Sequence, residues 1–367
     1  MRLARIIACV MSLLPAGADA LAQDRGQKKL IEFGWDEPDT AFMRAHVAEM
    51  EKTPFNGCVF HAYVSGPGGK QEPMLWQCWG RQAISPDQLK RSQEDLQKTQ
   101  FHRFTDNYLR LNTTPGDVDW FDDFGPILNN VRLAAAFARQ GKCKGILFDT
   151  EQYQQPLFTY ARQPDAKTKS WDQYAQQARK RGREVMQAFQ EGYPDLTIFL
   201  TFGYTLPWEE AHHNIAKLQD ARYGLLAPFL DGMLDAAKGK TRIVDGYEAS
   251  YPYRDVVRFD AAYQMMSRGV LPLVKDAQKY HQFFSFGFGV WLDCNWRKQG
   301  WDPRDVEKNF YTPGAFENTV HAALARADEY VWIYSEQPRW WSAQGGPVKL
   351  PDAYEKSLRQ AAGSKHE

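Results

Sequence analysis

Eight short apolar segments recur along the chain, and most of them are separated by stretches whose apolar residues have helical spacing. The segments are Leu30 to Trp35, Gly57 to Tyr63, Phe104 to Leu111, Gly145 to Thr150, Leu196 to Tyr204, Arg242 to Tyr247, Phe283 to Leu292 and Tyr330 to Ser335. Apolar strands that alternate with amphipathic helices pair in parallel through right-handed crossovers. Eight such units predict an α/β fold, a single (β/α)8 TIM barrel with long loops after its strands.

An open, doubly wound sheet is the alternative, but that fold favours a glycine-rich phosphate loop after an early strand. Gly66 to Lys70 lacks the Ser or Thr and the spacing of such a loop, and Gly287-Phe288-Gly289 lacks a third glycine. The sequence therefore predicts neither a nucleotide site nor any other cofactor.

Residues typical of helix starts and of amphipathic helices support the alternation of strands and helices. Ser170 to Tyr193 has helical spacing and begins with a residue that can cap a helix N-terminus. Phe124 to Gln140 has the same pattern, and Thr312-Pro313 opens another helix with proline in its first turn. We expect two long loops, one from Val64 to Gln100 and one after the fifth strand. The first carries Trp76 and Trp79 and is expected to form a wall of the substrate site.

The N-terminal residues are typical of an export signal. Arg2 and Arg5 precede the apolar run Ile6 to Leu14, and Ala20-Leu21-Ala22 is a small-residue cleavage site. A short N-terminal anchor is the alternative, but the run is too short to span a bilayer, and no later segment approaches about 18 apolar residues. We expect a signal peptide over 1–22, a barrel over 29–345, a flexible C-terminal tail over 346–367, and a periplasmic or extracellular location.

The balance of charged residues gives no indication of a highly charged binding partner. The chain has 45 Lys and Arg against 45 Asp and Glu, with a pI near 7.1, so it carries no electrostatic signature of a nucleic-acid or anionic-membrane partner. Four cysteines remain after the signal, which allows one disulfide or buried thiols. Their spacing does not indicate a metal site, and the sequence leaves the oligomeric state open.

Carboxylates and large aromatic residues dominate the expected carboxyl ends of the strands, where barrels of this kind build their active sites. The residues expected to bind substrate are Trp35, Asp36, His61, Tyr63, Tyr204, Tyr247, Glu248, Trp291, Asn295 and Trp340. Aromatic faces pack on sugar rings, while carboxylates bind hydroxyls and carry out acid/base chemistry. Trp and Tyr also pack between strands and helices, so part of this set could be structural. The mixture predicts a carbohydrate ligand.

The fourth segment ends in Asp149-Thr150-Glu151. Residues two apart on a strand point to the same side, so both carboxylates are expected to face the site. Like charges this close raise the pKa of one member, which suits a general acid. An acidic pair at the protein surface, or an Asp that caps the next helix, is the alternative. The other candidate catalytic carboxylates are Asp293 and Glu336.

The stretch Gly145-Ile146-x-x-Asp149-x-Glu151 resembles the strand-four signature of the family 18, chitinase-like glycoside hydrolases. The resemblance implies that Glu151 protonates the glycosidic oxygen and that Asp149 orients a substrate 2-acetamido group as internal nucleophile. The chain also resembles the large barrel clan of retaining glycosidases, in which the acid/base Glu ends strand four and the nucleophile ends strand seven. Both resemblances point to Glu151, and its partner stays open among Asp149, Asp293, Glu248 and Glu336.

The sequence therefore predicts an exported glycoside hydrolase that cleaves a polysaccharide or oligosaccharide, with Glu151 as proton donor. The alternative is a non-catalytic carbohydrate-binding protein on the same barrel, because one fold can host many functions.

Overall fold

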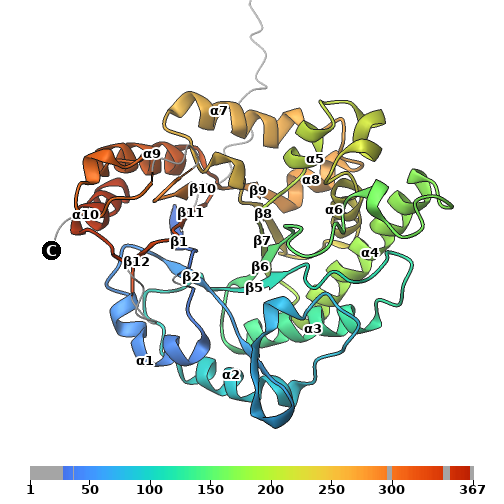
Figure 1. Ribbon diagram of the computed structural model, residues 1–367, viewed down its shortest axis with the longest axis horizontal. Helices are drawn as coiled ribbons and strands as arrows, with labels where there is room; N and C mark the ends of the chain where they lie inside the picture. The colour runs from blue at the N-terminus through green and yellow to red at the C-terminus, as the bar shows by residue number, and fades with distance from the viewer. Residues whose placement is uncertain (1–27, 36, 296–299, 342–347, 364–367) are drawn as a thin grey trace, which may run out of the picture.

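Nine strand segments pair side by side in parallel at the centre of the molecule, with helices around them (Figure 1). The computed structural model describes residues 28–35, 37–295, 300–341 and 348–363, with only the backbone at 348 and 349, so the predicted signal peptide and Asp36 lie outside the described residues. The strands are β1 (Lys29–Glu32), β2 (Gly57–Phe60), β5 (Tyr108–Asn112), β6 (Gly145–Asp149), β7 (Thr197–Leu200), β8 (Arg242–Asp245), β9 (Phe284–Phe286), β10 (Phe288–Trp291) and β11 (Tyr330–Tyr334).

The sheet closes on itself. Its order is β10-β11-β1-β2-β5-β6-β7-β8-β9, so β9 and β10 form its two ends, and only Gly287 separates them along the chain. A Cβ atom on Gly287 would lie 2.7 Å from the carbonyl oxygen of Tyr330, which explains why the interruption carries no side chain. The two segments are one interrupted strand, so the ring has eight strands, and the predicted (β/α)8 barrel is confirmed.

Helices cover the outside of the ring. They are α1 (Thr40–Met50), α2 (Pro86–Lys98), α3 (Gly125–Gln140), α4 (Trp171–Gly192), α5 (Thr205–Glu210), α6 (Leu226–Ala236), α7 (Val256–Gln264), α8 (Ala277–Phe283), α9 (Pro313–Arg326) and α10 (Asp352–Ala361). The predicted start of α4 is confirmed, because the Ser170 hydroxyl accepts from the backbone N–H of Gln173, whose side chain accepts from Ser170 N–H. The predictions of α3 and α9 are confirmed as well.

Short elements complete the loops. The pair β3 (Tyr63–Ser65) and β4 (Gln71–Pro73) is antiparallel, and β12 (Pro338–Arg339) pairs with β13 (Val348–Lys349). Short helical segments are the 3-10 turns η1 (Pro67–Gly69), η2 (Met74–Trp76), η3 (Tyr160–Arg162), η4 (Ile215–Asp220), η5 (Glu248–Ser250) and η7 (Val306–Lys308), and the π-helical turn η6 (Met265–Gly269).

Two expected irregular segments contain helices. The predicted long loop from Val64 to Gln100 is wrong over Pro86–Lys98, where α2 begins with a capping box between Ser85 and Gln88. The predicted flexible tail is wrong over Asp352–Ala361, because α10 buries Tyr354 and Leu358 and packs against α9. Their spacing of four residues places these two side chains on one face of the helix.

The barrel interior and the layer between strands and helices form separate apolar cores. The interior holds Ile31, Phe33, Val59, Tyr108, Leu147, Phe199, Val244, Tyr251, Tyr330 and Trp332. Because side chains alternate along a strand, the residue two positions after an interior residue points into the same lumen, nearer the carboxyl end. This rule carries Arg110, Asp149, Thr201 and Tyr334 to the mouth of the barrel.

The four cysteines after the predicted signal, Cys58, Cys78, Cys143 and Cys294, are buried thiols. Of the two alternatives that the sequence left open, one disulfide or buried thiols, the structure has the buried thiols. No helix in the described part of the chain has the length and apolar character needed to cross a membrane.

Candidate active site

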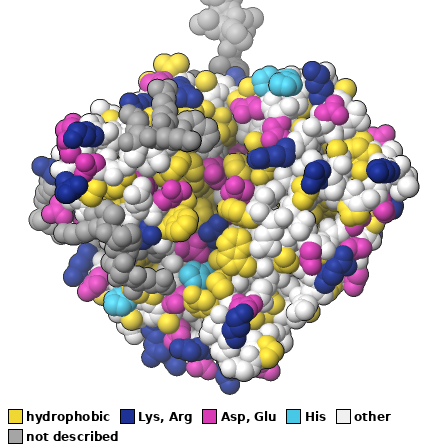
Figure 2. Space-filling model, in the orientation of Figure 1, with side chains coloured by type: hydrophobic (Ala, Val, Ile, Leu, Met, Phe, Trp, Pro, Cys, Tyr) yellow, Lys and Arg dark blue, Asp and Glu magenta, His cyan; other side chains and the backbone are white. Residues whose placement is uncertain are grey.

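A cleft of about 910 Å³ opens at the carboxyl ends of the strands. Figure 2 shows carboxylates and hydrophobic side chains gathered around the hollow on this face. Of the residues that the sequence predicts for the site, those that line the cleft are Trp35, His61, Tyr63, Asp149, Glu151, Glu248, Trp291 and Glu336. Six of the eight barrel strands and their loops thus bring predicted residues into one space.

Asp149, the last residue of β6, is buried and fully hydrogen-bonded. Its Oδ2 accepts from Arg110 Nη2 at 2.9 Å and from the Tyr153 hydroxyl at 2.8 Å. Its Oδ1 accepts from the backbone N–H of Glu151 at 3.0 Å and from the Thr201 hydroxyl at 3.1 Å. A carboxylate offers about four lone-pair sites, so protein donors occupy all of them. Asp149 therefore fixes the start of the loop that carries Glu151.

Arg110 links three strands across the floor of the cleft. It lies 3.0 Å from Glu37 through Nη1 and 2.9 Å from Asp149 through Nη2, and its Nε donates to Asn112. His61 Nδ1 lies 3.2 Å from the other oxygen of Glu37. Burial opposes ionisation of Glu37, but the charge of Arg110 and the contact with His61 hold the pKa of Glu37 below its ordinary value. The floor is therefore a continuous chain of paired charges.

Glu151 and Glu248 lie in the same cleft, where the charge of Arg110 lowers their pKa values by less than the surroundings raise them. Burial, followed by the charge of Asp149, raises the pKa of Glu151. Burial, followed by the charges of Asp149 and Glu151, raises the pKa of Glu248 well above its ordinary value. Glu248 follows Tyr247, whose left-handed backbone (φ 43°) is costly for a bulky residue and is typical of functional sites. The negative charges of Asp149 and Glu151 therefore disfavour ionisation of Glu248.

Glu336 faces the cleft, whereas Asp293 supports the residues around it. Glu336 lines the cleft and accepts from the Tyr334 hydroxyl at 3.2 Å, while burial and the charge of Asp293 raise its pKa. Asp293 is buried outside the cleft lining. It accepts from the indole of Trp291 at 3.0 Å and from the backbone N–H groups of Glu336 and Gln337 at 2.9 and 2.8 Å. Asp293 therefore holds two loops in place, and Arg339 donates to the backbone carbonyl of Glu336.

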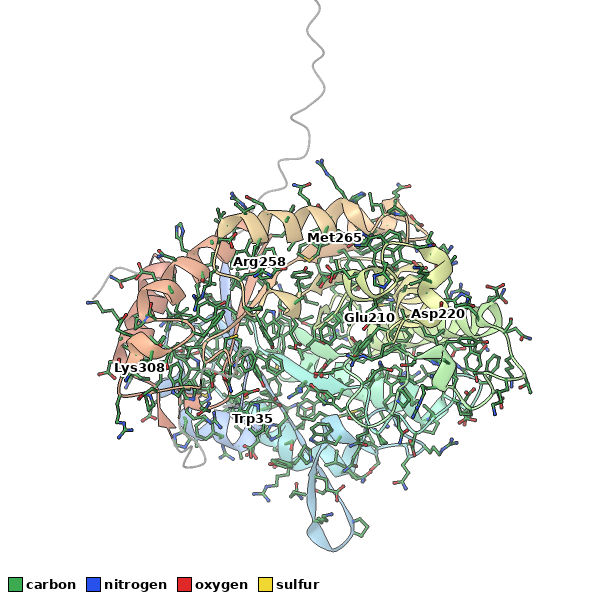
Figure 3. The ribbon with its side chains drawn as sticks, turned by 45° about the horizontal axis from the view of Figure 1, so that its top comes forward. Trp35, Glu210, Asp220, Arg258, Met265 and Lys308 are labelled. Carbon is green, nitrogen blue, oxygen red and sulfur yellow. The ribbon has the colours of Figure 1, made fainter. Side chains whose placement is uncertain are left out.

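Aromatic side chains form the walls. Trp35 is 68% exposed, and its indole donates to the Tyr334 hydroxyl at 2.9 Å. In the view of Figure 3, Trp35 lies below Arg258 and Met265, toward the lower side of the molecule. On the wall formed by the β6 loop, Trp76 and Tyr153 meet edge to face with ring centroids 5.6 Å apart. The walls thus offer exposed aromatic surface to a ligand.

Four further residues predicted to bind substrate lie outside the cleft lining. Tyr204 is buried behind the barrel, where its hydroxyl donates to Asp231. Tyr247 is buried with its hydroxyl 3.3 Å from that of Tyr253, and Asn295 accepts from Gly300 N–H. Trp340 packs edge to face on Phe55. Of the tryptophans in the predicted loop wall, Trp76 lines the cleft, whereas Trp79 is fully buried in the outer core.

The sequence did not single out Arg110, Tyr153, Tyr251 or Tyr334. Arg110 had one available signal, a basic residue inside the otherwise apolar Phe104 to Leu111 segment. Tyr251 and Tyr334 stack with ring centroids 5.2 Å apart at the inner edge of the cleft. In the described part of the chain, no three His, Cys, Asp or Glu side chains are arranged to hold a metal ion.

No protein-family model and no curated protein matches the chain. Solved structures that align with it include an endocellulase from Pyrococcus horikoshii, with 14% identity, 90% of this chain and 91% of that chain covered, and a TM-score of 0.45. A family 5 glycoside hydrolase from Prevotella bryantii aligns with 8% identity, 89% and 88% coverage and a TM-score of 0.47. An enzyme of subfamily 18 of that family from Streptomyces cattleya aligns with 12% identity, 93% and 82% coverage and a TM-score of 0.44. At these values the alignments carry no information about function.

Proposed function

We propose that this chain hydrolyses glycosidic bonds, with Glu151 and Glu248 as the pair of reacting carboxyls. The observation that carries this proposal is that both carboxyls line one cleft walled by exposed aromatic side chains, where burial raises the pKa of each and the charges of Asp149 and Glu151 raise that of Glu248 further. Glycoside hydrolysis needs one carboxyl that carries a proton and one that does not. Neighbouring carboxyls whose environments raise their pKa values by different amounts can meet this requirement.

In this mechanism the protonated member gives its proton to the glycosidic oxygen as the bond from that oxygen to the anomeric carbon breaks. The ionised member either attacks the anomeric carbon or removes a proton from the water that attacks it. Water supplies the new hydroxyl group, and its remaining proton restores the starting protonation of the pair. Arg110 and Asp149 do not react in these steps, but they fix the backbone from which Glu151 projects.

The sequence assigns the proton donor to Glu151, and we retain this assignment as a proposal. The competing assignment is Glu248, because it lies deeper among carboxylates. Aryl glycosides with good and poor leaving groups separate the two. Removing the donor slows poor leaving groups far more than good ones, since only poor ones need a proton. We expect Glu151→Gln to show this selectivity and Glu248→Gln to slow both substrates; the reverse pattern reassigns the donor to Glu248.

The acetamido mechanism implied by the family 18 resemblance has less support. An Asp that orients an acetamido group needs a free oxygen, and the four acceptor sites of Asp149 are filled by protein donors. The structure therefore favours direct carboxylate chemistry, for which a 2-acetamido group is not required.

The test is release of reducing ends from a panel of N-acetylated and plain polysaccharides and oligosaccharides. Glu151→Gln and Glu248→Gln are measured beside the native chain, and we expect each to lose at least about 10²-fold in turnover. Glu49→Gln is the control, because that side chain is 74% exposed. Calorimetric binding of an oligosaccharide without cleavage would instead establish the carbohydrate-binding alternative.

We also propose that the chain is exported through its first 22 residues to the periplasm or the extracellular space. N-terminal sequencing of the protein from its native host tests this, because export predicts a mature chain that begins after Ala22.

A further inference from the structure

We propose that the substrate is a glycan polymer whose chain runs past the cleft into a second binding cavity on the loops after β5 and β6. This inference rests on the proposed function and adds a site to it. The second cavity has a volume of about 520 Å³ and is lined by residues 116–119, 121, 122, 155–157 and 162–165 together with Arg81. It lies beside the mouth of the barrel, since both loops leave the carboxyl ends of their strands.

The two cavities share one wall. Glu151 and Tyr153 line the cleft, and Gln155, Pro156 and Leu157 line the second cavity. Two residues of extended chain span at most about 7 Å. A bound glycan that leaves the cleft over Tyr153 therefore reaches Gln155 within about the length of one sugar ring.

The second cavity presents the side-chain chemistry that binds sugars. Phe121 remains 38% exposed although Lys169 Nζ lies 4.8 Å from its ring centre and Tyr174 packs edge-on at 5.1 Å. Gln155 and Arg162 are exposed at the same cavity and offer hydrogen bonds to hydroxyl groups. An aromatic ring held in place beside hydrogen-bonding side chains is the composition expected for a sugar subsite.

Hydrogen bonds make the cavity rigid. The buried amide of Gln163 donates to the carbonyls of Pro156 and Leu157 at 3.0 and 2.9 Å. The indole of Trp120 donates to the same Leu157 carbonyl at 2.9 Å. A preformed cavity binds a polymer without the cost of ordering its own loops.

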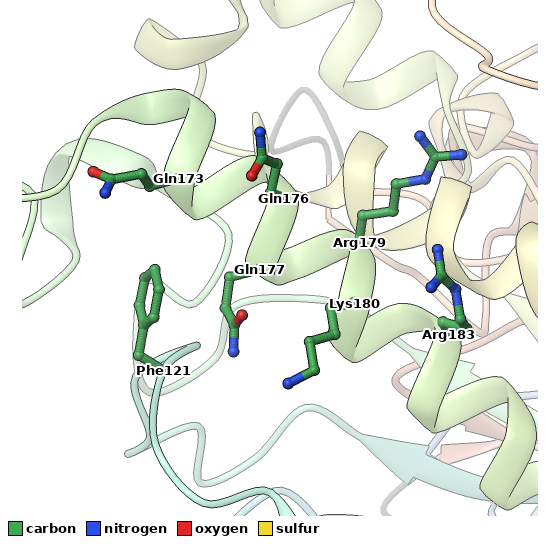
Figure 4. Close-up of a pocket in the computed structure, with 7 residues that line it drawn as sticks. All are labelled: Phe121, Gln173, Gln176, Gln177, Arg179, Lys180 and Arg183. Carbon is green, nitrogen blue, oxygen red and sulfur yellow. The ribbon is translucent and has the colours of Figure 1, made fainter.

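A groove on the outer face of α4 continues from Phe121, which also lines it (Figure 4). Its other lining residues are Gln173, Gln176, Gln177, Arg179, Lys180 and Arg183. Carboxylates pair with its cations, because Asp235 binds both arginines and Glu184 lies 3.7 Å from Lys180. The second cavity and the groove that continues from it therefore favour a neutral glycan over an anionic one.

The experiment compares Phe121→Ala with the native chain on a long and a short substrate. Affinity electrophoresis in gels that contain hydroxyethyl cellulose, xyloglucan or glycol chitin measures polymer binding, and an aryl glycoside that fills only the cleft measures chemistry. Val257→Ala on α7 is the matched control, an apolar side chain that is 69% exposed and lies across the barrel. We expect Phe121→Ala to weaken polymer binding about threefold to tenfold, the usual worth of an aromatic contact, and to leave aryl glycoside turnover unchanged.

The outcomes separate this inference from the proposed function. If the native chain cleaves the aryl glycoside and Phe121→Ala binds every polymer as the native chain does, the second cavity is not a subsite but the hydrolase proposal stands. If polymer binding depends on Phe121 and no substrate is cleaved, the second cavity stands and the hydrolase proposal fails. Equal losses on the long and the short substrate would show a general structural defect and would overturn the inference.

Discussion

Arg110 Nη2 lies 2.9 Å from Asp149 Oδ2, and this contact ties the floor of the cleft to the loop that carries Glu151. The same guanidinium binds Glu37 through its other terminal nitrogen. Its removal leaves two buried carboxylates without their cation. Arg110 is thus a positioning residue whose charge also acts on the reacting pair.

We expect Arg110→Met to lower the free energy of unfolding by about 3 kcal/mol, because breaking one side of a buried ion pair leaves uncompensated charge. Its positive charge lowers the pKa values of Glu151 and Glu248 in the native chain. Without it both pKa values rise, so the high-pH limb of kcat/KM moves to higher pH. Arg110→Lys keeps the charge and should keep the limb near its native position. An unshifted pH profile in a folded Arg110→Met protein would contradict the electrostatic role.

Glu248→Gln should stabilise the chain at neutral pH. The pKa of Glu248 is raised in the folded state, so the folded state binds its proton more tightly than the unfolded state does. Stability from this proton is fully present below the unfolded pKa of about 4.3 and is lost as the pH rises toward the folded value. Gln carries no charge, so its unfolding free energy should match the native one at pH 4 and exceed it by about 1 kcal/mol at pH 8. Urea unfolding of both proteins across this range measures the difference, with Glu49→Gln as control, and parallel curves would refute it.

We expect Asp293→Ala to weaken substrate binding more than it slows the catalytic step. Its carboxylate accepts from the indole of Trp291 and from two backbone N–H groups, so its loss leaves three donors without their acceptor at a cost of about 3 kcal/mol. Because Trp291 and Glu336 line the cleft, KM should rise more than kcat falls. A nucleophile would behave differently, with a collapse of kcat and partial recovery on addition of azide. Steady-state kinetics with and without azide distinguish the two roles.

The cleft should reject uronic acid polymers. The carboxylate side chains in its lining are Glu37, Asp39, Asp149, Glu151, Glu248 and Glu336, against the two cations Arg110 and Arg339. Like charge at short range disfavours an anionic ligand, and added salt screens this repulsion. Polygalacturonate should therefore neither be cleaved nor compete with a neutral substrate at low ionic strength. If polygalacturonate competes more strongly with the neutral substrate as salt is removed, the arginines and not the carboxylates determine the electrostatic preference of the cleft.

The strands of the barrel could be predicted because each is a short apolar run bounded by polar residues. Helix α2 was missed because only Leu89, Ser92 and Leu96 of its thirteen residues are buried, and its remaining side chains are those of a solvated loop. The cleft carboxylates Glu151, Glu248 and Glu336 were found because each lies two or three residues after the last residue of a strand.

The remainder of the site depends on distances that local sequence does not contain. Arg110 meets Glu37 across 73 positions of the chain, and this contact follows from the placement of β1, β2 and β5 side by side in the sheet. Tyr204 was predicted to bind substrate but does not line the cleft. It lies four residues beyond the end of β7, where the chain has turned behind the barrel, and its hydroxyl donates to Asp231. The predicted catalytic and substrate-binding residues that line the cleft all lie within three residues of the end of their strand.

The single interrupted strand around Gly287 has a consequence for the behaviour of the chain in concentrated solution. A sheet with two ends presents rows of unpaired N–H and C=O groups to which another chain can add. Here those rows belong to the two halves of one strand: β9 pairs with β8 and β10 with β11, while on their other sides Phe286 bonds to Asp328 and Gly289 to the Ser250 hydroxyl. The ring thus has no edge available for strand addition, and it resists that route to aggregation for as long as it stays closed.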